Sequence, residues 1–324
     1  MQLRLRRGLL CVAVIELYGD CASDPPLGAT ARTLATLRAD DVVYGLGVLA
    51  LERRAKTLGL AVRDSAAHAA LATALARLEA RVELVQVADA WPTVLAARSV
   101  ARADELVLAA ERARGAFGHQ YLTIAGAVAT PAVRAADPLA TVVELVAGAG
   151  GALVEDWVAV AGGAPAGRLV ERTTQARELG PLVLILPAGH QIVRRLRTPL
   201  ADWLLRAASA CEGCRVCSDA CPQPLAPHEI VWTLSTLRDD GVELLRALAC
   251  TGCGLCDAMC PSTLSPRALV VDVRDRLVHG NVKGHANGSV KGHLNANAAG
   301  LDLALLTLRL GLAPYDRPVD VSLR

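Results

Sequence analysis

Eight of the ten cysteines in this 324-residue chain lie in two copies of one motif, C-x-x-C-x-x-C-x-x-x-C-P. The copies occupy residues 211–222 and 250–261, so they are 39 positions apart. Other landmarks repeat at the same offset, among them Pro227 and Pro266. A chain with this pattern has to place two short cysteine-rich loops in related positions, and we therefore expect a duplicated module.

The cysteine spacing indicates an iron-sulfur site. Three thiolates spaced by two residues can wrap one face of an iron-sulfur cube, and in two-cluster ferredoxins the fourth cysteine of each run binds the other cluster. The pattern therefore predicts two [4Fe-4S] clusters with crossed ligands. One cluster would be held by Cys211, Cys214, Cys217 and Cys260, and the other by Cys250, Cys253, Cys256 and Cys221.

Two other interpretations of the cysteines are weaker. A structural zinc ion takes four ligands, usually from two C-x-x-C pairs, and would leave the third cysteine and the closing C-P of each motif without a use. A disulfide framework belongs to small secreted domains, and this chain is neither small nor equipped for export. The two remaining cysteines, Cys11 and Cys21, each stand alone and are expected to be inert apolar residues.

Composition argues against several classes of protein. The net charge is +2 at pH 7 with no clustered basic face, which gives no reason to expect a nucleic-acid partner. Much of the apolar 53% is alanine, and no apolar run reaches the roughly 18 residues of a transmembrane span. Residues 4–15 resemble a signal peptide, but Glu16 interrupts the run and no cleavage site follows. Because cluster thiolates must stay reduced, we expect a cytoplasmic protein.

Residues 1–118 alternate short apolar runs with alanine-rich stretches. Periodicity predicts helices at 42–60, 66–78 and 103–114 and a strand at 81–87, which together indicate an α/β layer. No G-x-G-x-x-G follows a strand here, so this region shows no dinucleotide-binding fingerprint.

In residues 119–172, glycines lie between short strand-like and helical runs. Strand-like runs at 121–128 and 157–160 flank a helical run at 139–147, a pattern that fits a β-grasp module. The connector that follows, 173–198, holds another strand at 182–186 and three arginines. Arg194, Arg195 and Arg197 could neutralise anionic clusters or dock an acidic partner, whereas the default interpretation is a solvated linker face.

Helical patterns surround the cysteines. Pro199 starts a helix that leads into the first motif, and helical faces at 230–237 and 242–248 separate the motifs, where a bacterial ferredoxin would have strands. Residues 199–280 are therefore predicted to be an α-helical two-cluster domain. In the tail, V-K-G-H occurs at 282–285 and at 290–293; this repeat is typical of a flexible linker rather than a metal site, and an apolar docking helix follows at 301–312.

With these landmarks placed, the chain resembles the C-subunit family of the Rnf electron-transport complex and, within it, the cobalamin reductases of propanediol-utilisation compartments. The resemblance lies in residues 121–128 with Pro131, in 184–190 with Arg194 and Arg195, in both cysteine motifs and in 310–318. It identifies residues 119–172 as the SLBB β-grasp domain of that family. The fold class it implies is α/β plus α: an N-terminal α/β layer, the SLBB module and the helical two-cluster domain, closed by a flexible linker and docking helix at 281–324.

The N-terminal third departs from the family. Members there resemble the flavin- and NADH-binding subunit of respiratory complex I, with a G-G-x-G-F-P-T loop and an acidic E-C-E-P turn. The nearest sequence here is Ala90-Trp91-Pro92-Thr93, and the acidic turn is missing. Without the glycines, backbone amides cannot approach a flavin phosphate. We therefore expect residues 1–118 to be a degenerate or truncated region without flavin or nicotinamide chemistry of its own.

The expected function is electron transfer through two clusters, with no catalytic residue in the chain itself. The resemblance implies an electron-donor reductase and an acceptor that is either a protein or a corrinoid, and a location in the cytoplasm, in a microcompartment or at the edge of a membrane complex. A complete NADH- and flavin-dependent cobalamin reductase and a scaffold with purely structural clusters are the alternatives.

Overall fold

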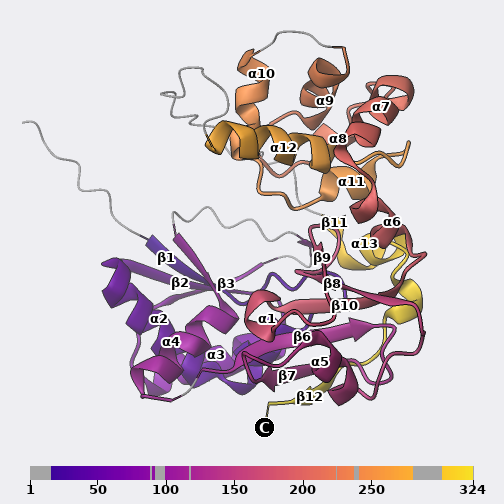
Figure 1. The fold of residues 1–324 in the computed structure, drawn as a ribbon. Helices are drawn as coiled ribbons and strands as arrows, with labels where there is room; N and C mark the ends of the chain where they lie inside the picture. The colour runs from indigo at the N-terminus through magenta and orange to yellow at the C-terminus, as the bar shows by residue number, and fades with distance from the viewer. Residues whose placement is uncertain are drawn as a thin grey trace, which may run out of the picture.

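A computed structural model describes residues 16–87, 90–91, 99–116, 118–223, 225–236, 241–279 and 301–323. These residues form a four-stranded sheet, a six-stranded sheet and a helical module (Figure 1). Three features of the sequence lie outside the described residues: the signal-like start with Cys11, residues Pro92 and Thr93 of the stretch that stands in place of the family's glycine-rich loop, and the repeated V-K-G-H stretch.

The N-terminal layer has four parallel strands in the order β3-β2-β1-β5. The strands are β1 (Glu16–Asp20), β2 (Thr57–Val62), β3 (Glu83–Gln86) and β5 (Ser99–Arg102). The helices are α1 (Thr30–Leu37), α2 (Ala39–Arg53), α3 (Ser65–Arg77) and α4 (Ala103–Ala113). They share one apolar core with the sheet, in which Leu17, Leu46 and Leu106 are fully buried. The predicted α/β character of this region is confirmed.

The helix predicted at 42–60 is two elements. Helix α2 ends at Arg53, because Arg54 takes a left-handed conformation with φ of 55°, and β2 begins at Thr57. The residues around this turn are mostly charged (Glu52, Arg53, Arg54 and Lys56). Glu, Arg and Lys are good helix formers, so the sequence alone does not mark the break between helix and strand.

The six-stranded sheet is mixed, with the order β12-β7-β6-β10-β8-β9. Its strands are β6 (Gln120–Gly126), β7 (Ala132–Ala136), β8 (Trp157–Ala161), β9 (Arg168–Val170), β10 (Leu182–Pro187) and β12 (Asp320–Ser322). Strand β10 comes from the predicted connector and β12 from the tail, so the sheet reaches well beyond residues 119–172. A short pair, β4 (Ala90–Trp91) with β11 (Leu301–Asp302), completes the strands of the described residues.

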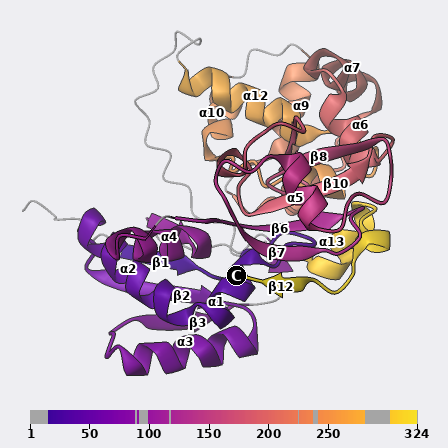
Figure 2. The same cartoon turned by 60° about the horizontal axis from the view of Figure 1, so that its bottom comes forward.

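Side chains of β10 alternate between two apolar cores, as expected for a strand covered on both faces. Val183 and Ile185 pack with α5 (Val142–Gly148) on one face. Leu184 and Leu186 pack on the other face with α6 (Gln191–Arg197) and α13 (Leu303–Arg309). Figure 2 shows the C-terminal segment, drawn in yellow, lying along this sheet.

The helical module repeats one plan twice. Helix α7 (Leu200–Ala210) leads into the first motif, followed by α8 (Val216–Asp219) and α9 (Pro227–Ser235). Helix α10 (Gly241–Leu245) and the 3-10 turn Arg246–Ala249 lead into the second motif, followed by α11 (Leu255–Met259) and α12 (Pro266–Val278). The duplication and the helical nature predicted for this region are seen in these elements. None of the helices in the described residues combines the length and apolar character needed to cross a bilayer.

Polar contacts join the N-terminal layer to the six-stranded sheet. Arg38 donates to the hydroxyl of Tyr121 at 2.6 Å and to Glu111 at 3.1 Å. Thr123 accepts the backbone N–H of Ala29 at 3.0 Å. Burial, together with the hydrogen bond to Glu111, raises the pKa of Tyr121 to about 12. The tyrosine therefore stays neutral, and its hydroxyl donates a hydrogen bond to the carboxylate of Glu111.

A substitution of Gly126, at the end of β6, tests the close contact between β6 and β10. Its φ is 94°, and a Cβ there would lie 2.2 Å from the carbonyl oxygen of Ile185. We expect Gly126→Ala to destabilise the full chain by more than about 2 kcal/mol, because both the left-handed backbone and the close approach disfavour a side chain. Urea denaturation followed by circular dichroism measures this. Gly189→Ala, where a Cβ meets open space, is the matched control, and equal midpoints for the two variants would contradict the packing described.

Candidate metal centres

The eight motif cysteines gather around two cavities of the helical module. The first cavity is lined by Cys211, Cys214, Cys217 and Cys260. The second is lined by Cys221, Cys250, Cys253 and Cys256. Each cavity combines three cysteines of one motif with the last cysteine of the other, which is the grouping that crossed ligation requires. The ligation itself stays a prediction. Within the described ranges, no three His, Cys, Asp or Glu side chains already stand in the close arrangement of a metal-ion site.

Left-handed residues shape both cysteine loops. Gly213 and Gly252 take φ values of 66° and 71° at equivalent positions of the two motifs. Two residues later, Arg215 and Gly254 take φ values of 66° and 80° and precede α8 and α11. The chain therefore turns twice between the first and third cysteines of each motif. This double turn lets three successive cysteines line one small cavity.

Burial controls the acidity of the cysteines. It raises the pKa of Cys217 to about 12, and the neighbouring Cys260, Cys211 and Cys214 add to the effect. It also raises the pKa of Cys221 to about 12, with a smaller contribution from Cys253 and Cys250, which belong to the other motif. The bare thiols of Cys217 and Cys221 thus keep their protons. A bound cation would reverse this preference, since a coordinating thiol is deprotonated by its metal.

Backbone N–H groups point at the sulfur atoms. Gly252 donates to Sγ of Cys250 at 3.3 Å. The amides of Ser262 and Leu264 hydrogen-bond to Cys260 and oppose the rise in its pKa that burial causes. Such N–H donors stabilise negative charge on sulfur. Four thiols, nearby amide donors and a largely apolar lining in each cavity fit an anionic iron-sulfur cluster.

The second motif is fixed to the six-stranded sheet. Leu255 and Ala258 belong to the core beneath β10, and Pro165 touches the loop at Gly254. Arg267 reaches across the boundary. Its Nε donates to the carbonyl of Gly252 at 2.8 Å and its Nη2 to the carbonyl of Ala166 at 2.7 Å. No sequence pattern signals these long-range contacts.

A buried carboxylate ties the second motif to α12. Asp257 accepts the hydroxyl of Ser265 at 2.6 Å and the backbone N–H of Arg267 at 2.8 Å. Burial raises the pKa of Asp257, although the nearby charge of Arg195 and these hydrogen bonds oppose the rise. The first motif is more open, because Cys214 is exposed to solvent.

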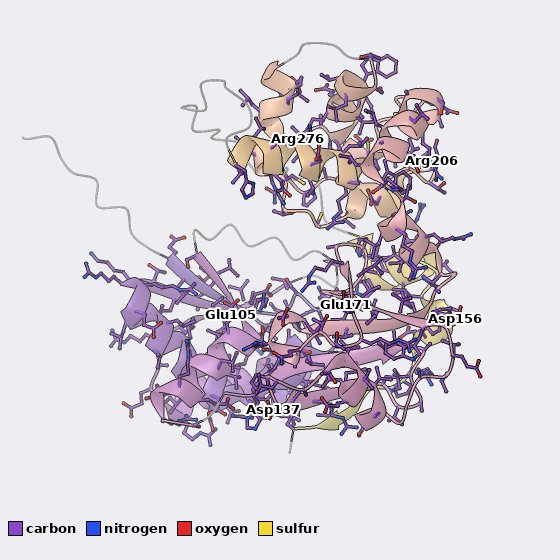
Figure 3. The ribbon with its side chains drawn as sticks, in the orientation of Figure 1. Glu105, Asp137, Asp156, Glu171, Arg206 and Arg276 are labelled. Carbon is purple, nitrogen blue, oxygen red and sulfur yellow. The ribbon has the colours of Figure 1, made fainter. Side chains whose placement is uncertain are left out.

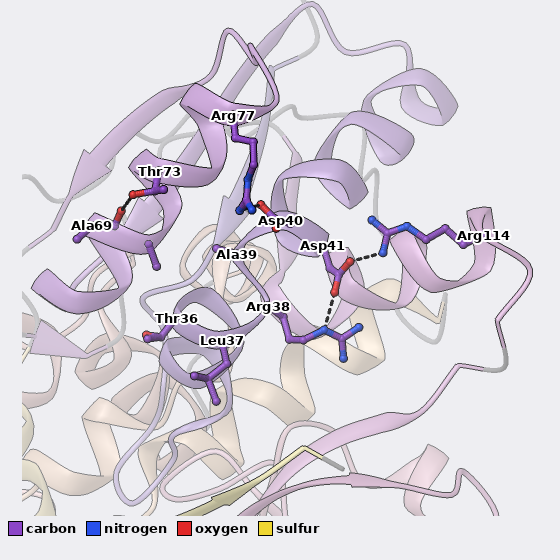
Figure 4. Close-up of a pocket in the computed structure, with 11 residues that line it drawn as sticks. Thr36, Leu37, Arg38, Ala39, Asp40, Asp41, Ala69, Thr73, Arg77 and Arg114 are labelled. Carbon is purple, nitrogen blue, oxygen red and sulfur yellow. Dashed lines mark hydrogen bonds and ion pairs between the residues drawn. The ribbon is translucent and has the colours of Figure 1, made fainter.

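The groove at the junction of α1 and α2 is an ion-paired surface rather than a redox site (Figure 4). Asp41 binds both Arg38 and Arg114, and Asp40 binds Arg77. Each arginine in the groove thus has a carboxylate partner, so little charge is left to bind a ligand.

The switch point of the N-terminal sheet, between β1 and β5, is where an α/β layer usually binds a ligand. The helix that follows β1 is α1. Its first amides are already used, since the buried Asp24 accepts the N–H of Ala31 at 2.9 Å and of Arg32 at 3.0 Å. Cys21 is also buried there, and burial raises its pKa, as expected for an unreactive thiol.

Part of the chain is similar to two curated proteins. It is 36% identical over 111 residues to cobalamin reductase PduS of Citrobacter freundii and 35% identical over 111 residues to that of Salmonella typhimurium. Each match covers 34% of this chain and 24% of the relative, so the similarity spans about a quarter of the length of those proteins. No protein-family model matches the chain.

Two solved structures of an NAD+-reducing [NiFe]-hydrogenase are also similar. The air-oxidised form gives a TM-score of 0.48 at 16% identity, covering 95% of this chain and 62% of the other. The H2-reduced form gives 0.46 at 16% identity, covering 83% and 56%.

Position 254 of the second motif is equivalent to position 215 of the first, but only Gly254 lies against Pro165. A Cβ on Gly254 would lie 2.8 Å from the Pro165 ring, whereas Arg215 already carries a side chain in the same backbone conformation. We expect Gly254→Ala to destabilise the full chain by about 1–3 kcal/mol and Arg215→Gly to change its stability by less than about 1 kcal/mol. Thermal unfolding measures both. An equal loss in the two variants would contradict docking of the second motif on the sheet.

Proposed function

We propose that the chain is an iron-sulfur electron carrier that holds two [4Fe-4S] clusters and relays single electrons from a reductase to a partner protein or a corrinoid. The observation that carries the proposal is the pair of cavities, each lined by four cysteines drawn from both motifs. Partial similarity to cobalamin reductase PduS supports a redox role and makes a corrinoid a candidate acceptor.

In this proposal Cys211, Cys214, Cys217 and Cys260 hold one cluster, and Cys250, Cys253, Cys256 and Cys221 hold the other. Bound clusters would supply one-electron chemistry. The chain's own residues set the conditions for it. Backbone amides at Gly252, Ser262 and Leu264 offset negative charge on sulfur, and apolar walls limit water, two factors that tune cluster potentials. Arg274 holds the second loop through the carbonyl of Cys250 at 2.9 Å.

The remaining parts take supporting roles. The six-stranded sheet, proposed to include the SLBB module, carries the second motif and offers a surface for a partner or a corrinoid. Residues 1–118 are proposed to lack flavin and nicotinamide chemistry, because Asp24 takes the helix amides that a phosphate would need. Electrons would then come from a separate reductase, in the cytoplasm, in a microcompartment or beside a membrane complex.

The crossed ligation is tested by changing the last cysteine of each motif. Cys221→Ala should damage the cluster held by the second motif, and Cys260→Ala the cluster held by the first, because each removes one of four ligands from the other half. Electron paramagnetic resonance after dithionite reduction should show a different surviving signal in each variant. If each variant lost only the signal of the cluster held by the motif that carries the substitution, crossed ligation would be contradicted. Cys21→Ala, outside the motifs, is the control and should keep both signals.

The competing function, a complete NADH- and flavin-dependent reductase, is tested by titration. Full-length protein with reconstituted clusters should show no micromolar binding of FMN in calorimetry and no bleaching of cluster absorbance by NADH. Stoichiometric flavin binding with NADH-dependent bleaching would replace the carrier proposal with the enzyme. A scaffold role instead requires clusters that dithionite cannot reduce.

A further inference from the structure

An arginine-lined groove lies beside the first cavity. It has a volume of about 610 Å³ and follows the junction of α6 and α7. Its cationic side chains are Arg194, Arg195, Arg197 and Arg206, against which it has one carboxylate, Asp202. The lining therefore carries a strong excess of positive charge.

The fold itself does not use most of this charge. Among the described residues, Arg194, Arg197 and Arg206 are exposed and make no ion pair. Arg206 lies over the buried ring of Trp203, with 5.2 Å from the guanidinium carbon to the ring centroid. Figure 3 labels Arg206 on the helical module. In the groove at α1 and α2, by contrast, every arginine has a carboxylate partner.

The groove adjoins the first four-cysteine cavity. Thr263 lines the groove, while Cys260 and Ser262, just before it, line the cavity. Thr263 has a φ of 52°, which is unusual for a β-branched residue, and strained residues of this kind cluster at functional sites. Trp203, also in the groove, shares an apolar core with Cys211. A partner seated here would lie close to the first cavity.

Charge and shape indicate the kind of occupant. Small-molecule sites are mostly apolar and enclose their ligand, whereas this groove is open and lined by arginines. Clustered exposed charge instead steers and orients a protein of opposite charge. We propose that this groove docks the acidic surface of a redox partner protein beside the first cluster. This inference rests on the proposed electron-carrier function and names the surface that serves it.

The test compares two sets of variants of the full chain with reconstituted clusters. The groove variant is Arg194→Gln/Arg197→Gln/Arg206→Gln. The control removes the same number of charges from exposed sites elsewhere: Arg112→Gln/Arg177→Gln/Arg276→Gln. The probe is an acidic flavodoxin. When reduced, its flavin gives up one electron and one cluster accepts it, which stopped-flow absorbance follows. Calorimetry with oxidised flavodoxin measures docking without electron transfer.

At low salt the groove variant should be reduced roughly tenfold more slowly than the wild type and the control, and its affinity for oxidised flavodoxin should fall by a similar factor. The difference should shrink as salt screens the charges. Equal rates and affinities in all three proteins would overturn the inference. Unchanged flavodoxin binding, together with micromolar pyrophosphate binding that only the groove variant loses, would overturn it in favour of a small-anion site.

Reduction by dithionite needs no docking surface, so it tests the proposed electron-carrier function independently of the groove. If dithionite fails to reduce the wild type, the electron-carrier proposal fails. The binding measured with oxidised flavodoxin would still decide whether the groove receives an acidic protein.

Discussion

The exchange of the last cysteine between the two motifs is the constraint on which the helical module depends. Cys221 lines the cavity of the second motif, and Cys260 lines that of the first. Neither cavity is therefore lined by four cysteines of a single motif. A helix begins soon after each of these cysteines, α9 at Pro227 and α12 at Pro266, and the two helices share an apolar core.

Duplication gives two similar cavities in different surroundings. The second motif packs on the six-stranded sheet through Leu255 and Pro165, and Arg267 hydrogen-bonds across the boundary. The first motif has an exposed Cys214 and borders the arginine groove. One cavity is therefore held against the six-stranded sheet and the other is turned toward solvent, where the proposed electron carrier would meet a partner.

Local sequence information predicted the parts of the structure that depend on local geometry. Cysteine spacing and the prolines at 199, 227 and 266 indicated the module, its duplication and its helices. The sequence predicts a strand at 182–186 but not its place between β6 and β8, because the residues of a strand do not identify the strands that pair with it. The helix predicted at 42–60 joins a helix and a strand, because the charged residues between them, from Glu52 to Lys56, are good helix formers and do not mark the turn. Arg194, Arg195 and Arg197 form a basic run in the sequence, whereas Arg206 and Thr263 join them in the groove only through folding.

The central claim is that the eight motif cysteines hold two [4Fe-4S] clusters. Mössbauer spectroscopy of the full chain reconstituted with ⁵⁷Fe, combined with iron and sulfide analysis, tests it most directly. The account predicts about eight iron and eight sulfide per chain, with spectra of [4Fe-4S] clusters alone. Tightly bound zinc without sulfide, or no more than about four iron per chain, would contradict it.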